Sequence, residues 1–221
     1  MQRPPLTEAQ EDYLKNLLLL ELEGQAPVST QALASRMGVR PPSATEMLKK
    51  LALLGLVEHQ PYQGASLTLA GRRVALEVLR HHRLLEAYLH QALGYGWEEV
   101  HEEAERLEHV ISEAFEARIA ELLGHPPFDP HGDPIPTQDL ALPEAPATPL
   151  TEAPLGEARV VRALVQDPGT LHLLARLGLT PGARLRVLER QNGVRVALGN
   201  KVFLLPPDLA AAVGVEAGGD D

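Results

Sequence analysis

The 221-residue sequence predicts a mainly α-helical protein with a small β domain near its C-terminus. Three observations lead to this fold class. Residues 7–69 show the order of a winged helix-turn-helix, short helices followed by a two-stranded ribbon. Two long amphipathic helices are predicted next. After a proline-rich stretch, short alternating segments separated by turn signals such as Asn192-Gly193 predict a small, partly open barrel of the SH3-like or OB-like kind.

The N-terminal region is expected to contain three helices and a hairpin. Thr7 to Gln10 match a capping box, and a leucine-rich stripe at helical spacing follows them. Ser29 and Thr30 are capping residues, and Pro41-Pro42 are typical of a helix start. The later helices are expected at 31–36 and 43–54, and the strands at 56–59 and 66–69 with a turn at 61–64.

The second helix of a winged helix-turn-helix lies in the DNA major groove. Here the corresponding helix, 43–54, carries small hydroxyls, a guanidinium and lysines, which suit base edges and phosphates. A helical bundle with a solvated polar face is the alternative interpretation. The predicted DNA-contacting residues are Arg40, Pro42, Ser43, Thr45, Glu46, Lys49 and Lys50.

The middle region is expected to hold two long helices, from about Ala70 to Leu93 and from about Trp97 to Leu123. Two long amphipathic helices cannot bury both apolar stripes within so small a region, so a homodimer is predicted. Residues 130–154, rich in Pro, Ala and Thr, predict an extended, mobile linker. The strands of the last region are expected at 158–165, 185–189, 194–198 and 202–205, before a helical turn at Pro206-Pro207.

The net charge of -10 is unevenly distributed. Residues 1–80 have nine basic and eight acidic side chains, residues 81–156 have three and fifteen, and residues 157–221 have eight and seven. The middle third therefore holds the acidic excess, together with seven of the nine histidines. An acidic chain argues against a nucleic-acid partner only if its charge is evenly spread, and here the N-terminal region is nearly neutral.

Other chemistry is excluded by composition. The chain has no cysteine, so disulfides, thiolate-bound zinc and thiol catalysis are ruled out. No apolar run approaches the ~20 residues of a membrane span, and no signal peptide is expected at the N-terminus. A cytoplasmic location is therefore predicted.

The acidic region contains histidine–carboxylate patterns that suit a metal. His101, Glu105, Glu108 and His109, at offsets of 0, 4, 7 and 8 residues, are expected to share one face of a helix. His82 and Glu86, four residues apart, are expected to stack on one face of the preceding helix. Imidazole with carboxylate and without thiolate suits Mn²⁺, Fe²⁺, Zn²⁺ or Co²⁺; solvated surface ion pairs are the alternative. The candidate ligands are His101, Glu105, Glu108 and His109 on one helix and His82 and Glu86 on the other. His90, His125 and His131 are expected to be surface residues, and His81, which points away from the His82/Glu86 face, is expected to have no role in metal binding.

Several short motifs occur in order along the chain: Glu11-Asp12-Tyr13-Leu14, Gly55-Leu56-Val57, Leu67-Thr68-Leu69-Ala70-Gly71, His82-Arg83-Leu84-Leu85-Glu86, Val100-His101-Glu102-Glu103-Ala104 and Glu108-His109-Val110. A chain with these motifs resembles the diphtheria toxin repressor family of metal-dependent transcriptional regulators, including its manganese-sensing branch. The resemblance runs from about Thr7 to Pro136 and continues more weakly through the C-terminal barrel.

The resemblance implies a homodimeric, metal-dependent repressor of metal uptake and homeostasis genes that binds double-stranded DNA with an inverted-repeat operator. It implies no organic cofactor and no membrane partner. The implied domains are a winged helix-turn-helix DNA-binding domain at 1–74, a helical metal-binding and dimerisation domain at 75–136, a Pro-rich linker at 137–156 and an SH3-like (FeoA-like) domain at 157–221.

The resemblance also implies two metal sites per subunit. Asp12 and Glu105 are acidic, as in manganese-responsive members, whereas iron-responsive members have methionine and cysteine there; Mn²⁺ is therefore favoured, with Fe²⁺ the alternative. Lys15 stands where two-domain manganese sensors have a ligating glutamate, so their binuclear cluster is not expected. The implied primary ligands are Asp12, Glu105, Glu108 and His109, and the ancillary ones are His82, Glu86 and His101, with Asp167 from the SH3-like domain and with Thr170 and His172 nearby.

Asp12 suggests how metal controls DNA binding, because it lies on the first helix whereas the other implied primary ligands lie in the middle region. Metal would tie the two regions together and fix the spacing of the dimer's recognition helices against half-sites about 34–36 Å apart. A metal-dependent hydrolase and a winged-helix regulator that responds to an organic ligand are the alternative functions. Ester turnover would identify the first, and chelator-insensitive DNA binding the second.

Overall fold

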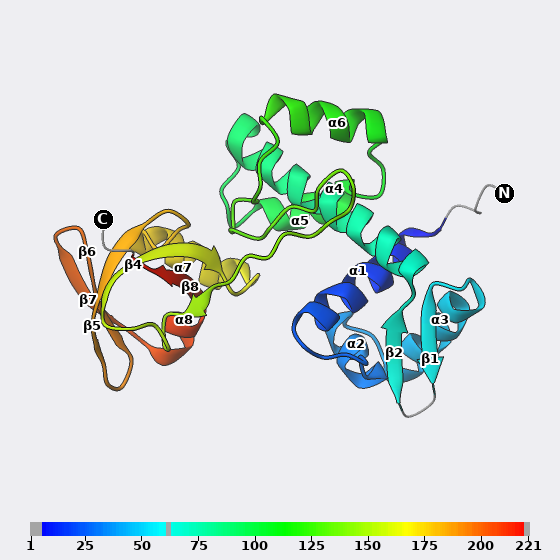
Figure 1. Ribbon diagram of the computed structural model, residues 1–221, viewed down its shortest axis with the longest axis horizontal. Coiled ribbons are helices and arrows are strands. Elements are labelled where there is room, and N and C mark those ends of the chain that lie inside the picture. Colours follow the sequence, from blue (N-terminus) through cyan, green and yellow to red (C-terminus); the bar gives the residue numbers. More distant parts are fainter. Residues whose placement is uncertain (1–5, 61–62, 219–221) are drawn as a thin grey trace. The chain divides into compact units, whose positions relative to one another are not determined.

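A computed structural model of the protein describes residues 6–60 and 63–218 (Figure 1). The chain divides into two compact units. The first contains the residues up to His81 and two later segments, Glu108–Ile111 and Pro136–Leu142. The second contains His82–Leu107, Ser112–Ile135 and the residues from Pro143 onward. A unit therefore combines segments that are far apart in the sequence.

The first unit has the elements of a winged helix-turn-helix. Thr7 caps α1 through the predicted capping box, since Thr7 Oγ1 accepts from Gln10 N and Gln10 Oε1 accepts from Thr7 N. The wing strands pair antiparallel, with Val57 opposite Leu67, and the predicted turn residues Pro61 and Tyr62 lie outside the described residues. The elements are α1 (Glu8–Leu22), α2 (Thr30–Arg36), α3 (Pro41–Leu53), β1 (Val57–Gln60) and β2 (Gly64–Leu67).

Leucines from all three helices fill the core of this unit. Leu14, Leu17 and Leu18 of α1, Leu33 of α2 and Leu48 of α3 are fully buried. Complete burial of a leucine side chain contributes about 1.5–3 kcal/mol. The apolar stripes read from the sequence are thus the inward faces, and the polar face of α3 is left for solvent or a ligand.

Three helices form the middle of the chain: α4 (Leu69–Leu93), α5 (Val100–Leu107) and α6 (Glu113–Leu122). The prediction of one helix from Trp97 to Leu123 is wrong, because the chain leaves the helical conformation after Leu107. Ser112 starts a new helix by accepting a hydrogen bond from Phe115 N at 3.3 Å. Glu108 and His109 therefore lie in the connection and not on a helical face with His101.

The C-terminal β domain is an antiparallel sheet with the strand order β3-β8-β4-β5-β6-β7. Its core includes Leu171 and Leu174 from α7 and Val196 from β6, all completely buried. The sequence predicted neither α7 nor β8. The elements are β3 (Thr148–Pro149), β4 (Gly156–Ala163), α7 (Pro168–Leu177), β5 (Arg184–Arg190), β6 (Val194–Leu198), β7 (Lys201–Leu205), α8 (Pro207–Ala211) and β8 (Val213–Ala217).

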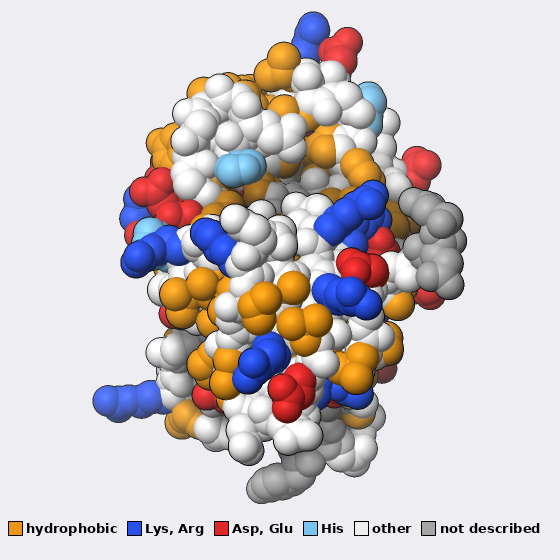
Figure 2. Space-filling model, turned by 90° about the vertical axis from the view of Figure 1, so that its left-hand side faces the viewer, with side chains coloured by type: hydrophobic (Ala, Val, Ile, Leu, Met, Phe, Trp, Pro, Cys, Tyr) orange, Lys and Arg blue, Asp and Glu red, His pale blue; other side chains and the backbone are white. Residues whose placement is uncertain are grey.

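One side of this domain carries exposed apolar residues on its strands, among them Leu188, Val202 and Leu204. Figure 2 views the molecule from the side of β5 to β7 and shows hydrophobic side chains interspersed with Lys and Arg. No helix among the residues that the structure describes combines the length and apolarity needed to cross a bilayer.

Part of the stretch predicted to be a mobile linker is packed. His131 and Ile135 are 0% and 3% exposed, and Ala163 N of β4 donates to His131 O at 2.8 Å. Gly132 has φ +87°, and a Cβ there would lie 2.0 Å from Val161 O. Only glycine tolerates both the left-handed backbone and the close approach, so this loop is fixed against β4.

Candidate metal centre

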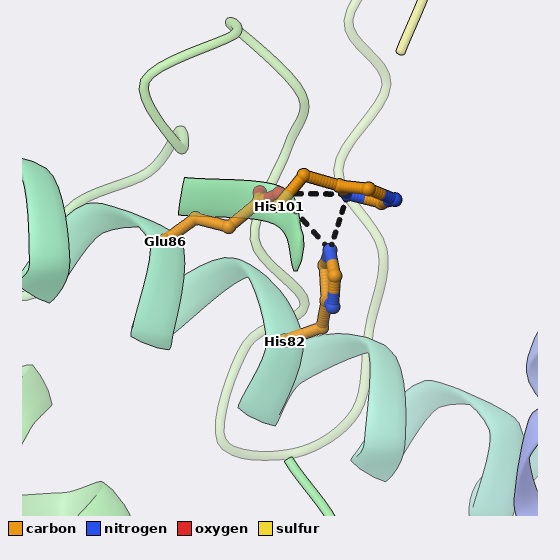
Figure 3. Close-up of side chains that lie close together, drawn as sticks. All are labelled: His82, Glu86 and His101. Carbon is orange, nitrogen blue, oxygen red and sulfur yellow. Dashed lines mark hydrogen bonds and ion pairs between the residues drawn. The ribbon is translucent and has the colours of Figure 1, made fainter. Parts of the chain in front are cut away.

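Three predicted ligands meet within the second unit (Figure 3). His82 and Glu86 lie one turn apart on α4, and α5 supplies His101. His82 Nε2 is 3.0 Å from Glu86 Oε1 and 3.1 Å from His101 Nδ1, and His101 Nδ1 is 3.1 Å from Glu86 Oε1. The three potential ligand atoms thus form a nearly equilateral triangle.

This triangle fits one divalent cation. Two ligand atoms that each lie about 2.1 Å from a metal, at right angles, are about 3.0 Å apart. Glu105, on α5, lies beside the same group, with its Oε1 3.9 Å from His82 Nδ1 and 3.8 Å from His101 Nε2. The prediction grouped Glu105 with Glu108 and His109; within this unit Glu105 is also a neighbour of His82 and His101.

Burial in this cluster opposes the charged form of its carboxyl group. The Glu86 side chain is 2% exposed and that of His82 is 6% exposed. Burial alone raises the pKa of Glu86, but attraction to His82, hydrogen bonds with His101 and His82, and the nearby His131 imidazole outweigh it, so its pKa lies well below the ordinary value. The carboxylate is therefore held in its charged form.

His131 is a functional candidate that the sequence analysis missed. Its prediction as a surface residue is wrong: it is completely buried, with Nδ1 3.6 Å from Glu86 Oε2 and Nε2 2.7 Å from Trp97 O. Burial lowers the pKa of His131, but Glu86, Asp129 and the Trp97 carbonyl outweigh that effect and raise it to about 9. Glu86, Asp129 and His131 form a further buried group of ligand type.

A second cluster of predicted ligands lies within the first unit. Asp12 of α1 and the pair Glu108 and His109 come together there. His109 Nε2 is 2.9 Å from Asp12 Oδ1 and 3.3 Å from Glu108 Oε1. One imidazole and two carboxylates suit a hard divalent cation such as Mn²⁺.

Two further charged residues lie beside this cluster. Glu11 Oε2 is 2.7 Å from His109 Nδ1, and Lys15 Nζ is 2.5 Å from Glu108 Oε1. Burial lowers the pKa of His109, but the hydrogen bond to Glu11 and the charges of Glu108 and Asp12 outweigh it and raise the pKa. The sequence analysis did not predict a role for Glu11, although its place beside Asp12 in the first motif was a signal.

Asp167 caps α7. Its Oδ2 accepts hydrogen bonds from Thr170 N and Thr170 Oγ1, both at 2.8 Å. These bonds lower the pKa of Asp167, which is fully exposed. The nearby His172 pairs with Glu98, Nδ1 to Oε1, at 3.1 Å. The structure thus gives Asp167 a capping role and does not place it with His82, Glu86 and His101.

The other histidines divide into two kinds. His90 and His125 are exposed, as predicted. His81 is 8% exposed, and its Nδ1 lies 3.1 Å from the backbone oxygen of Glu108. His81 therefore contacts the connection that carries His109, which its sequence pattern did not indicate.

The predicted DNA-contacting face of α3 is accessible. Ala44, Leu48 and Leu51 point into the core, and the opposite face is polar. Thr45, half-buried, donates from Oγ1 to Pro41 O at 2.9 Å, and Lys50 pairs with Glu46 at 3.1 Å. The exposed predicted residues are Arg40, Pro42, Ser43, Glu46, Lys49 and Lys50.

Sequence-family comparisons cover most of the chain. Residues 5–65 match the iron-dependent repressor N-terminal DNA-binding domain, and residues 68–137 match the iron-dependent repressor metal-binding and dimerisation domain. Residues 148–217 match the FeoA domain. The order of these matches is the order of the three regions predicted from the sequence.

Full-length relatives agree with these matches. The chain is 35% identical over 226 residues to the iron-dependent repressor IdeR of Mycobacterium tuberculosis, covering 96% of this chain and 98% of that protein. It is 32% identical over 222 residues to the diphtheria toxin repressor of Corynebacterium glutamicum, covering 96% of this chain and 97% of that one.

Solved structures of similar proteins include manganese regulators. A manganese-dependent transcriptional repressor in complex with manganese is 41% identical, with a TM-score of 0.86, over 94% of this chain and 99% of that chain. The manganese regulator SloR is 31% identical, with a TM-score of 0.77, over 96% of this chain and 100% of that chain.

Proposed function

The chain belongs to the iron-dependent repressor family, to which the diphtheria toxin repressor belongs, and from this premise we propose that it is a manganese-responsive member. It is a metal-dependent, DNA-binding transcriptional repressor with a dimerisation domain, not an enzyme. The hydrolase and the regulator of organic-ligand type are therefore excluded. We further propose that the protein is cytoplasmic and represses metal-uptake genes, as the family resemblance implies.

The observation that carries the manganese proposal is the convergence of Asp12 with Glu108 and His109. Iron-type members of the family have a sulfur ligand at the position of Asp12, whereas an oxygen ligand favours the harder Mn²⁺. Fe²⁺ remains the alternative ion. The similarity to manganese-dependent repressors supports the same choice.

We propose two metal sites per subunit. The primary site consists of Asp12, Glu108 and His109, and the ancillary site of His82, Glu86 and His101. Glu105, predicted as a primary ligand, is proposed to act beside the ancillary group because its carboxylate lies near His82 and His101. Asp167 remains a proposed ancillary ligand only if it leaves its capping bonds with Thr170.

Control of DNA binding follows from where the primary residues lie in the chain. Asp12 belongs to α1 of the DNA-binding domain, while Glu108 and His109 belong to the connection between α5 and α6. A bound divalent cation would supply the positive charge that holds two carboxylates and one imidazole together. This metal link between α1 and the connection would restrict the positions that the DNA-binding helices can take in the dimer. One spacing of the two recognition helices would then be favoured.

The DNA interface is proposed to be the polar face of α3. Ser43 and Thr45 are proposed to face base edges, and Arg40, Lys49 and Lys50 to reach phosphates. Pro42 and Glu46 are exposed on the same helix and are proposed to belong to the interface. A symmetric dimer presents two such helices, so the operator is proposed to be an inverted repeat. The proposed boundary at 136 lies next to the end of the second family match at residue 137, whereas the second and third matches begin at 68 and 148, several residues before the proposed domain starts at 75 and 157.

The decisive experiment is a titration of operator binding with Mn²⁺, Fe²⁺, Zn²⁺ and Co²⁺ at matched free concentrations. Wild-type protein should bind DNA most tightly with Mn²⁺. Asp12→Ala should abolish the metal stimulation while the dimer persists in size-exclusion chromatography. Operator affinity that is unchanged by Asp12→Ala, or by every metal, would contradict the proposal.

A further inference from the structure

Glu11 contacts the imidazole of His109 on the edge opposite Asp12. Glu11 Oε2 lies 2.7 Å from Nδ1, while Asp12 Oδ1 lies 2.9 Å from Nε2. Neighbouring residues on a helix normally point about 100° apart, yet here both reach one ring. The His109 side chain is 7% exposed, and Glu108 Oε1 is a third carboxylate oxygen near the ring, 3.3 Å from Nε2.

The chemistry of the two ring nitrogens makes this arrangement directional. An ionised carboxylate only accepts hydrogen bonds, so a 2.7 Å contact with Glu11 requires a proton on Nδ1. A metal binds an imidazole nitrogen only when that nitrogen carries no proton. By the same argument the 2.9 Å contact with Asp12 places a proton on Nε2 in the metal-free protein. Nε2 is the nitrogen that faces both Asp12 and Glu108, so a cation bound between these two carboxylates would displace the proton of Nε2 and leave that of Nδ1 on Glu11.

We infer that Glu11 is a positioning residue of the primary metal site: it holds the Nδ1–H of His109 and thereby presents Nε2 to the metal. The inference rests on the proposed function, because it assumes that Asp12, Glu108 and His109 bind the ion. Carboxylates that hold a ligating histidine in this way typically change metal affinity by 10–100-fold.

The test compares Mn²⁺ affinity by electron paramagnetic resonance in wild type, Glu11→Ala, Glu11→Gln and two references. Glu11→Ala should bind Mn²⁺ about 10–100-fold more weakly. Glu11→Gln should keep most of the affinity, because its amide oxygen can still accept a hydrogen bond from Nδ1–H. Glu8→Ala removes the same charge from an exposed position one turn earlier on α1 and should bind Mn²⁺ as wild type does.

A spectroscopic measurement reports the ring directly. In protein loaded with diamagnetic Zn²⁺, ¹⁵N–¹H correlations of His109 should show a protonated Nδ1 and a metal-bound Nε2 in wild type and in Glu11→Gln. The spectrum of Glu11→Ala should no longer show this combination of a protonated Nδ1 and a metal-bound Nε2 as its only pattern. A metal-bound Nδ1 in wild type would overturn the inference, as would wild-type Mn²⁺ affinity in Glu11→Ala.

Asp12→Ala separates the two ways of failing. If Asp12→Ala loses Mn²⁺ affinity and Glu11→Ala does not, the primary site stands and the role of Glu11 is wrong. If both variants keep wild-type affinity, the proposed site itself is wrong.

Discussion

Replacing Lys15 by methionine tests the charge balance of the primary cluster. Lys15 Nζ lies 2.5 Å from Glu108 Oε1, and the two side chains are 3% and 0% exposed. Removing one partner of a buried ion pair costs about 3–5 kcal/mol, because the other charge stays buried and uncompensated. His109 Nε2 lies 3.3 Å from the same oxygen and offers partial compensation, so the lower end applies, about 3 kcal/mol.

The expected change is large enough to measure by thermal unfolding. At roughly 2–4 °C per kcal/mol for a chain of this size, 3 kcal/mol corresponds to a Tm lower by about 6–12 °C in the presence of a chelator. Bound Mn²⁺ would replace the lost positive charge beside Glu108. The difference in Tm between Lys15→Met and wild type should therefore shrink when saturating Mn²⁺ replaces the chelator.

Lys50→Met is the matched control. Lys50 pairs with Glu46 at 3.1 Å, but the side chains are 57% and 70% exposed, and exposed pairs contribute at most about 1 kcal/mol. Lys15→Met should therefore unfold well below Lys50→Met. Equal Tm values for the two variants, measured by circular dichroism with chelator, would refute the argument from burial.

Three further predictions concern the other groups. His82→Ala should reduce the Mn²⁺ bound per subunit by one ion in equilibrium dialysis while Asp12→Ala removes a different ion; two variants with unchanged stoichiometry would count against two sites. The pKa of His131 is raised to about 9 in the folded chain, against roughly 6.5 in an unfolded chain. The protonated imidazole therefore stabilises the metal-free fold fully below about pH 6.5, and this stabilisation is lost as the pH rises through 9. Urea unfolding should show this loss, on the order of 3 kcal/mol, in wild type but not in His131→Gln, and parallel pH curves would contradict it. Lys49→Ala should weaken binding to all operator sequences similarly and reduce the salt slope by about one in fluorescence anisotropy, whereas a sequence-dependent loss would argue against a phosphate contact.

Local signals predicted much of the fold. The capping box at Thr7, the apolar stripe of α1 and the Asn192-Gly193 turn each depend on neighbouring residues, and the structure contains all three. The break before α6 was missed because the apolar spacing continues through it, although Ser112 followed by acidic residues was a capping signal. Periodicity therefore indicates helical residues well but marks helix ends poorly.

Long-range contacts explain what the sequence analysis missed in the site. His82 and Glu86 are one helical turn apart, so their pairing could be predicted from spacing. His131 meets Glu86 across 45 positions of sequence, and His109 meets Glu11 across 98. No local pattern reports such a contact, and His131, which has no carboxylate four residues away on either side, was therefore interpreted as a surface residue.

The composition of the first unit has a consequence for work with fragments. Glu108–Ile111 and Pro136–Leu142 belong to it although they lie far from the DNA-binding helices in the sequence, and Leu140 and Leu142 pack against its core. A contiguous fragment that ends near residue 74 would keep Asp12 but lose Glu108, His109 and both leucines. Chimaeras that exchange the metal response between two relatives must therefore exchange three separate pieces of chain together.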